Sequence, residues 1–127
     1  MSIKSILVVD DCEPDQFVFK YAIENLDETI EVLQAYDGQE ALEIFSKAAA
    51  KPEAIVLDLN MPRMDGFEFL EEFSKQFADE TTRIAILTSS AQSKDKERVE
   101  GHPSVVNYYV KPLSKEKINE MLTALKG

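Results

Sequence analysis

The stretch SILVVDD, residues 5–11, is an unbroken apolar run that opens on a serine and ends on two aspartates. Alternation of apolar and polar side chains is needed only where one face of a strand meets water, so a continuous run is typical of a strand buried on both faces. The run therefore predicts that Ser5 to Val9 form a central strand. Asp10 and Asp11 then lie at the end of that strand.

Outward from this strand, short runs rich in Ile, Val and Leu alternate with longer segments of helical period. This alternation predicts an α/β fold in which helices cover a parallel sheet. The other strands are expected at 31–35, where the signal is weaker and suits an edge strand, and at 54–57, 84–87 and 105–110. Helices are expected from Pro14 to about Leu26, from the Asp37-Gly38 turn to before Pro52, over 66–77, over 93–100, and after a Ser114 cap.

Apolar residues at helical spacing indicate which face of each helix is buried. For the first helix, the stripe is expected to be Val18, Ala22 and Leu26, and the stripe of the second helix is expected to extend to Ala49. The segment 93–100 has little apolar character, so it is expected to be a mobile or partner-binding helix.

The composition limits the classes of partner and of protein. The chain has 127 residues, 44% of them hydrophobic, which suits one domain over 1–127 with no output domain. Its 24 acidic and 14 basic residues give a net charge of -10, so nucleic acid and anionic membranes are not expected partners. A signal peptide and a membrane span are not apparent, and Cys12 has no second cysteine to pair with. A cytoplasmic location is expected.

Polar residues stand at the ends of four predicted strands. Parallel strands joined by right-handed crossovers point their carboxyl ends to one edge of the sheet, where ligands bind. The residues expected to meet there are Asp10, Asp11, Asp58, Thr88 and Lys111. Three close carboxylates repel one another unless a cation joins them or a carboxyl group stays protonated, and an open shell of oxygen ligands favours Mg²⁺.

The same residues suggest phosphoryl chemistry. A carboxylate such as Asp58 is a known type of phosphoryl acceptor, and the product would be an acyl phosphate. Lys111 offers a positive charge to the incoming group, and the Thr88 hydroxyl can donate a hydrogen bond to one phosphoryl oxygen. The position of Thr88 would then depend on phosphorylation, as in a switch.

Four motifs together resemble the receiver domains of two-component response regulators, including the chemotaxis response regulator. They are VVDD at 8–11, DLNMPRMDG at 58–66, TSS at 88–90 and YYVKP at 108–112. The resemblance covers essentially the whole chain. It implies a flavodoxin-like, doubly wound five-stranded parallel sheet with strand order 2-1-3-4-5.

The resemblance also implies roles for individual residues. Asp58 would accept a phosphoryl group from the phosphohistidine of a sensor histidine kinase or a phosphotransfer protein. Asp11, Asp58 and the backbone carbonyl of Asn60 would bind Mg²⁺, with Asp10 acting mainly through water. Lys111 would contact the phosphoryl group and precede a cis proline, Pro112. The domain would not be an enzyme, although it assists its own phosphorylation and dephosphorylation.

The resemblance also implies that phosphorylation changes the surface of the domain. Thr88 would move toward the phosphoryl group, and the rotamer of Tyr108 would report this change. The face formed by the fourth helix, the fifth strand and the fifth helix would then bind a downstream protein or a second copy of the chain, unless Asp58 serves in a relay. The first helix, around Phe17, would lie near the kinase, and Asn60 and Ser90 would tune loss of the phosphoryl group.

Three alternatives belong to other classes. A phosphatase with an aspartyl nucleophile is expected to carry a second acid two residues later, where this chain has Asn60. A nucleotide-binding module is disfavoured because neither glycine-rich phosphate-binding motif occurs. The third alternative is a receiver-like module that binds proteins without phosphate, and the intact acidic pair, Asp58, Thr88 and Lys111 argue against it. Taken singly, Asp58 would be a turn former and Lys111 a solvated charge, and only their joint pattern favours chemistry.

Overall fold

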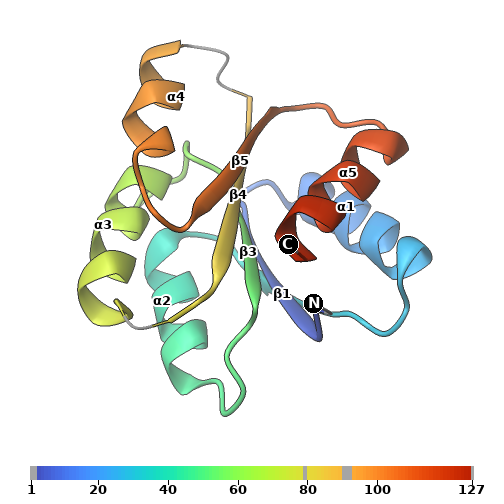
Figure 1. Ribbon diagram of the computed structural model, residues 1–127, viewed down its shortest axis with the longest axis horizontal. Coiled ribbons are helices and arrows are strands. Elements are labelled where there is room, and N and C mark those ends of the chain that lie inside the picture. The colour runs from blue at the N-terminus through green and yellow to red at the C-terminus, as the bar shows by residue number, and fades with distance from the viewer. Residues whose placement is uncertain (1–2, 79, 90–92, 127) are drawn as a thin grey trace.

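In the computed structural model, which describes residues 3–78, 80–89 and 93–126, strands and helices alternate along the chain (Figure 1). The elements in these residues are β1 (Ser5–Val9), α1 (Glu13–Leu26), β2 (Glu31–Ala35), α2 (Gly38–Lys47), β3 (Ala54–Leu57), α3 (Gly66–Gln76), β4 (Arg83–Thr88), α4 (Ser93–Glu100), β5 (Val105–Val110) and α5 (Lys115–Lys126).

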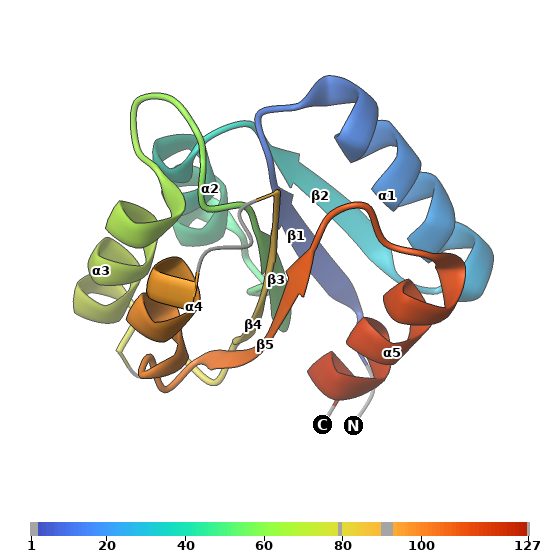
Figure 2. The same ribbon diagram turned by 90° about the horizontal axis from the view of Figure 1, so that it is seen from above.

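The strands form one parallel sheet in the order β2-β1-β3-β4-β5. Helices α1 and α5 cover one face, and α2, α3 and α4 cover the other (Figure 2). The predicted flavodoxin-like α/β fold and its strand order are therefore confirmed. The chain direction across the sheet reverses between β1 and β3, where Val9 lies beside Leu57, and the ends of these two strands carry Asp10 and Asp58.

The sheet separates two hydrophobic cores, because successive side chains of a strand point to opposite faces. In β1, Ile6 and Val8 face the core under α1 and α5, whereas Leu7 and Val9 face the core under α2, α3 and α4. The first core is mostly aliphatic and includes Ile118, Met121, Leu122 and Leu125 of α5. Both faces of the central strands are covered, which explains their continuous apolar sequence.

The buried face of α1 differs from the predicted one. Gln16, Phe19 and Ile23 are buried, whereas Val18 is 62% exposed, so the prediction for Val18 is wrong. Ala22 and Leu26 pack at the margin of the core. Apolar residues lie all around this helix, so their spacing alone did not define one face. The helix also begins at Glu13, one residue before Pro14.

The second helix ends earlier than its apolar pattern indicates. Helix α2 stops at Lys47, so Ala49 lies beyond it and is exposed, contrary to prediction. The Asp37 side chain caps the start of α2 by accepting a hydrogen bond from the Glu40 N–H at 2.8 Å. Ser114 caps α5 in the same way, as predicted, through the Lys117 N–H. Elsewhere the predicted bounds differ by about one residue.

Two further predictions can be compared with the structure. The Lys111-Pro112 peptide bond is cis, as the family resemblance implied. Within the described ranges, no helix is both long and apolar enough to cross a bilayer.

Candidate functional site

The backbone ladder of the sheet continues past the strands and fixes the residues at its edge. The Asp10 N–H donates to the Ala35 carbonyl at 3.0 Å, and the Asp58 N–H donates to the Val9 carbonyl at 2.9 Å. The Lys111 N–H donates to the Thr88 carbonyl at 2.8 Å. The residues that follow the strands are thus held almost as firmly as the strands themselves.

Three carboxylates meet at this edge. Oxygen atoms of Asp10, Asp11 and Asp58 all lie within 4.8 Å of one another. Asp10 and Asp58 are buried, whereas Asp11 is exposed. A hard divalent cation takes several oxygen ligands at short distance, so this acidic pocket has the donor set to hold one.

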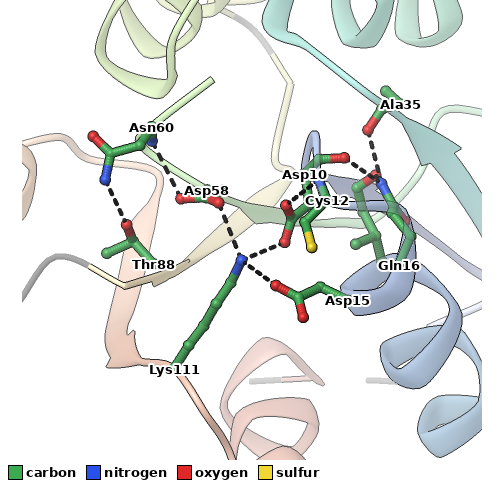
Figure 3. Close-up of polar contacts among 10 residues, drawn as sticks. Asp10, Cys12, Asp15, Gln16, Ala35, Asp58, Asn60, Thr88 and Lys111 are labelled. Carbon is green, nitrogen blue, oxygen red and sulfur yellow. Dashed lines mark hydrogen bonds and ion pairs between the residues drawn. The ribbon is translucent and has the colours of Figure 1, made fainter. Parts of the chain in front are cut away.

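The ammonium group of Lys111 lies among the carboxylates (Figure 3). Its Nζ is 2.6 Å from Asp10 Oδ2, 2.9 Å from Asp15 Oδ2 and 3.1 Å from Asp58 Oδ2. Burial acts to lower the pKa of Lys111, but the hydrogen bonds to Asp10 and Asp15 and the charge of Asp58 raise that pKa well above its usual value. The lysine is therefore a permanent cation in a cluster that still has an excess of negative charge.

Asp10 is oriented by the backbone on the other side of its carboxylate. Its Oδ1 accepts a hydrogen bond from the Cys12 N–H at 2.9 Å, and its Oδ2 accepts the hydrogen bond from Lys111. Burial raises the pKa of Asp10 above its ordinary value, although both hydrogen bonds act in the opposite direction. Cys12 thus contributes its backbone N–H to the site.

Gln16 braces the start of the site from α1. Its side-chain amide Nε2 donates toward the carbonyls of Val8, Asp10 and Ala35 at 3.0, 3.1 and 2.8 Å. The side chain is almost completely buried. It therefore ties the first turn of α1 to the ends of β1 and β2, which keeps Asp10 and Asp15 in fixed relation.

Asn60 and Thr88 lie on the other side of Asp58. The Asn60 N–H donates to Asp58 Oδ1 at 3.2 Å, and the Asn60 side-chain amide lies 3.5 Å from the Thr88 hydroxyl oxygen. Thr88 is fully buried, and Asn60 is exposed. The two oxygens of Asp58 thus have different partners, a backbone amide for Oδ1 and Lys111 for Oδ2. Ser90 lies outside the described residues.

The loop after Asp58 is held in one conformation. A Cβ atom on Gly66 would lie 2.6 Å from the Asp58 carbonyl oxygen, so only glycine permits this approach. On the far side, the Gly38 N–H donates to the Met64 carbonyl at 2.9 Å, and Arg63 forms an ion pair with Asp37. Arg63 has a positive φ of 62°, which the ion pair helps to maintain. These contacts connect the loop that follows Asp58 to β3 at one end and to the start of α2 at the other.

Tyr108 and Tyr109 point to opposite faces of β5. Tyr108 is half-buried against the core under α2, α3 and α4, and Tyr109 is buried in the core under α1 and α5. Tyr108 therefore lies on the side of the sheet that carries α4.

A cleft of about 380 Å³ opens beside the carboxylates. Asp10, Asp15, Asp58 and Lys111 line its polar end, and apolar residues from α1, α5 and the strands line the remainder. The cleft therefore provides space for a small ligand beside Asp58.

Two residues of the site were missed in the sequence. Asp15 and Gln16 do not lie at a strand end. The one signal in the sequence was the presence of an acid, Asp15, in the first turn of the helix that follows Asp11. Their contacts depend on how α1 lies over the sheet. In contrast, all the residues predicted from strand ends lie at one edge.

Comparisons with known proteins agree with this fold. The family model described as the response regulator receiver domain matches residues 6–123. The alkaline phosphatase synthesis transcriptional regulatory protein PhoP of Bacillus subtilis is 32% identical over 96% of this chain and 48% of that protein. The sensor histidine kinase CheAY of Helicobacter pylori is 30% identical over 92% of this chain and 14% of that protein. The chain thus spans about half, or less, of the length of these relatives.

Solved structures show the same likeness. The chemotaxis response regulator CheY4 of Vibrio cholerae is 29% identical, with a TM-score of 0.82 over 98% of this chain and 99% of that chain. The phosphorylated cyanobacterial phytochrome response regulator RcpA is 25% identical, with a TM-score of 0.81 over 98% and 92%. With the family model matching nearly the whole chain, the protein belongs to the response regulator receiver domain family of two-component signalling systems.

Proposed function

We propose that Asp58 accepts a phosphoryl group from a phosphohistidine of a sensor histidine kinase or a phosphotransfer protein. The observation that carries this proposal is the pairing of a buried carboxylate with the Lys111 ammonium 3.1 Å away, inside a cluster of further acids. A carboxylate oxygen of Asp58 would attack phosphorus and form an acyl phosphate. The P–N bond would break, and the imidazole would leave with its electron pair.

Mg²⁺ is the proposed metal partner of this reaction. Asp11, Asp58 and the Asn60 carbonyl would hold the ion directly, and Asp10 would hold it mainly through water. All these donors are oxygen atoms, as Mg²⁺ prefers. When bound, the ion would neutralise the negative charge of the carboxylates and of the phosphoryl oxygens.

Thr88 and Lys111 would then hold the phosphoryl oxygens. Thr88 is buried next to Asn60, so a hydroxyl that turns toward the phosphoryl group would change the contacts at the end of β4. Thr88 pairs with Val110 of the neighbouring strand β5, and Tyr108 lies two positions before Val110. Tyr108 would adjust its rotamer in response. This sequence of changes is proposed to convert phosphorylation into a change at the α4 side of β5.

The output is proposed to be a protein contact. The face formed by α4, β5 and α5 would regulate a downstream protein or join a second copy of the chain, and Asp58 could alternatively pass its phosphoryl group on in a relay. Val106 and Val110 of β5 are 39% and 40% exposed, which gives this face some apolar area. A cytoplasmic location stays a prediction.

The phosphoacceptor role is tested by incubation with acetyl phosphate and Mg²⁺, followed by intact mass spectrometry. Uptake of one phosphoryl group that needs Mg²⁺ supports the proposal. Asp58→Asn should abolish uptake and leave the fold intact. Asp65→Asn is the matched control, because it removes one charge from the same loop and asparagine still caps α3. Equal uptake by Asp58→Asn would contradict the proposal.

The switch is tested separately with the inert mimic beryllofluoride. Lys111→Ala should still permit uptake but remove the change at the Tyr108 side, read from NMR shifts of β5 amides. Size-exclusion chromatography with and without the mimic tests self-association. If neither uptake nor Mg²⁺-dependent binding of the mimic occurs, the phosphate-independent binding module is the better interpretation.

A further inference from the structure

Asp15 is a fourth carboxylate at the site, and it comes from a helix rather than a strand end. Its Oδ2 lies 2.9 Å from Lys111 Nζ, although the two residues are 96 positions apart (Figure 3). The Asp15 side chain is 46% exposed, whereas those of Asp10 and Asp58 are 6% and 7% exposed. Asp15 is thus the partner of Lys111 on the solvent side.

Lys111 has no unused donor in this arrangement. An ammonium group carries three N–H bonds, and each is directed to one carboxylate, Asp10, Asp15 or Asp58. A phosphoryl oxygen that is to be contacted by Lys111 must therefore replace one of these acceptors. Loss of the bond to Asp10 would leave a buried charge poorly compensated, which is costly.

Asp15 is the acceptor that can be displaced most easily. Water can solvate its half-exposed carboxylate as soon as Lys111 leaves. The helix fixes the starting point, because Gln16, the next residue, binds three carbonyls at the ends of β1 and β2. Asp15 therefore stays near the site while its hydrogen bond to Lys111 breaks.

We propose that Asp15 is a positioning residue that acts through Lys111: it holds the ammonium toward α1 in the unphosphorylated protein and competes with the phosphoryl group for it. This proposal rests on the phosphoacceptor function of Asp58. The competition lowers both the rate of phosphoryl uptake and the affinity for a phosphoryl mimic. It makes the resting state of the domain depend on α1 as well as on the strand ends.

The test compares Asp15→Asn with two other variants. Asp15→Asn keeps the size of the side chain and removes its charge, so uptake from acetyl phosphate should accelerate about twofold to fivefold, the range typical of one half-exposed ion pair. Asp15→Glu retains the charge and should stay close to the unsubstituted protein. Glu24→Gln, on the same helix but lining a separate groove, makes the same change in net charge and should have no effect.

A second variant pair separates positioning from general charge repulsion. In a Lys111→Ala background the ammonium is absent, so Asp15→Asn should no longer accelerate uptake. In the single variant Asp15→Asn, with Lys111 present, the affinity for beryllofluoride in the presence of Mg²⁺ should rise by a similar factor. This equilibrium affinity is measured by ¹⁹F NMR. Thermal unfolding of each variant controls for changes in the fold.

Each outcome decides between the proposals. Uptake and mimic affinity that are unchanged in Asp15→Asn would overturn the role of Asp15 while leaving the phosphoacceptor function in place. A gain that persists in the Lys111→Ala background, or that Glu24→Gln reproduces, would also overturn it. If the unsubstituted protein takes up no phosphoryl group and binds no mimic, both proposals fail together.

Discussion

Helices α3 and α4 lie side by side on the same face of the sheet, yet they are attached to it very differently (Figure 2). Helix α3 buries Gly66, Phe69, Leu70 and Phe73. In α4, among residues 94–100, Val99 is the one buried side chain. Burial of apolar area is the main source of tertiary stability, so α3 is fixed by its core face and α4 is not.

The attachment of α3 is reinforced by its neighbours and its cap. The rings of Phe45 and Phe73 are 5.0 Å apart in an edge-to-face arrangement, and those of Phe69 and Phe73 are 5.6 Å apart. At its start, Asp65 and Glu68 form a reciprocal capping box. The loop that leads from Asp58 to α3 is therefore held at both ends.

The described attachments of α4 are mostly polar and lie near its C-terminal end. The Arg98 guanidinium stacks 3.9 Å above the Phe67 ring. After the helix, His102 Nε2 lies 2.5 Å from the Ser74 hydroxyl of α3. Such contacts cost less to break than buried apolar ones. Helix α3, which follows the Asp58 loop, is therefore held by a buried core face, whereas displacing α4, at the proposed output face, requires less free energy.

The largest expected effect comes from removing the aromatic anchor of α3. Phe73→Ala should lower the free energy of unfolding by about 3–5 kcal/mol, because it leaves a cavity in the core. Urea titration followed by circular dichroism measures this change. A loss below about 1 kcal/mol would mean that α3 does not depend on its aromatic core face.

Truncation of the α4 anchor should be milder and local. Val99→Ala removes two methyl groups, so we expect a loss of about 1–2 kcal/mol. Amide hydrogen exchange should accelerate in α4 and stay unchanged in α3. Equal acceleration in both helices would show that they unfold as one unit and would contradict the weaker attachment of α4.

The cap of α3 sharpens the comparison at the level of single hydrogen bonds. Asp65→Ala removes the acceptor for the Glu68 N–H and should cost about 1 kcal/mol. Asp65→Asn retains a good capping residue and should cost much less. Thermal unfolding of the two variants measures the difference, and equal losses would point to the charge rather than the cap.

The smallest expected effect concerns pH and the contact between His102 and α3. The His102 Nδ1 accepts a hydrogen bond from the Ser104 N–H at 3.2 Å. The Ser74 hydroxyl donates to the Leu70 carbonyl, so His102 Nε2 is the donor toward Ser74. The neutral imidazole fits these contacts, and protonation of Nδ1 would break one of them.

Burial lowers the pKa of His102 below its ordinary value of 6.5, and the Leu70 carbonyl only partly offsets this effect. The unfolded chain thus binds the proton more readily, and the stabilising contribution is present above pH 6.5 and decreases as the pH falls through the folded pKa. His102→Gln should flatten the dependence of the unfolding temperature on pH between 7.5 and 5.5. An unchanged slope would assign this dependence to other groups.

The fold and most of the residues at the site could be predicted from the amino-acid sequence. Continuous apolar runs define buried parallel strands, and parallel strands bring Asp10, Asp58, Thr88 and Lys111 to one edge whatever the details of packing. For this reason, strand ends alone predicted a cluster of acids with one lysine. The strand order came from the resemblance carried by four motifs.

The orientation of α1 against the sheet could not be predicted in this way, because it depends on how the helix packs. Apolar residues surround this helix, so its period permitted several orientations, and the chosen one buries Gln16 and leaves Val18 in solvent. That orientation directs Asp15 to Lys111. The ion pair between Arg63 and Asp37 likewise depends on how the loop after Asp58 packs against α2. Contacts between residues far apart in the chain depend on the relative placement of whole elements, which local periodicity does not encode.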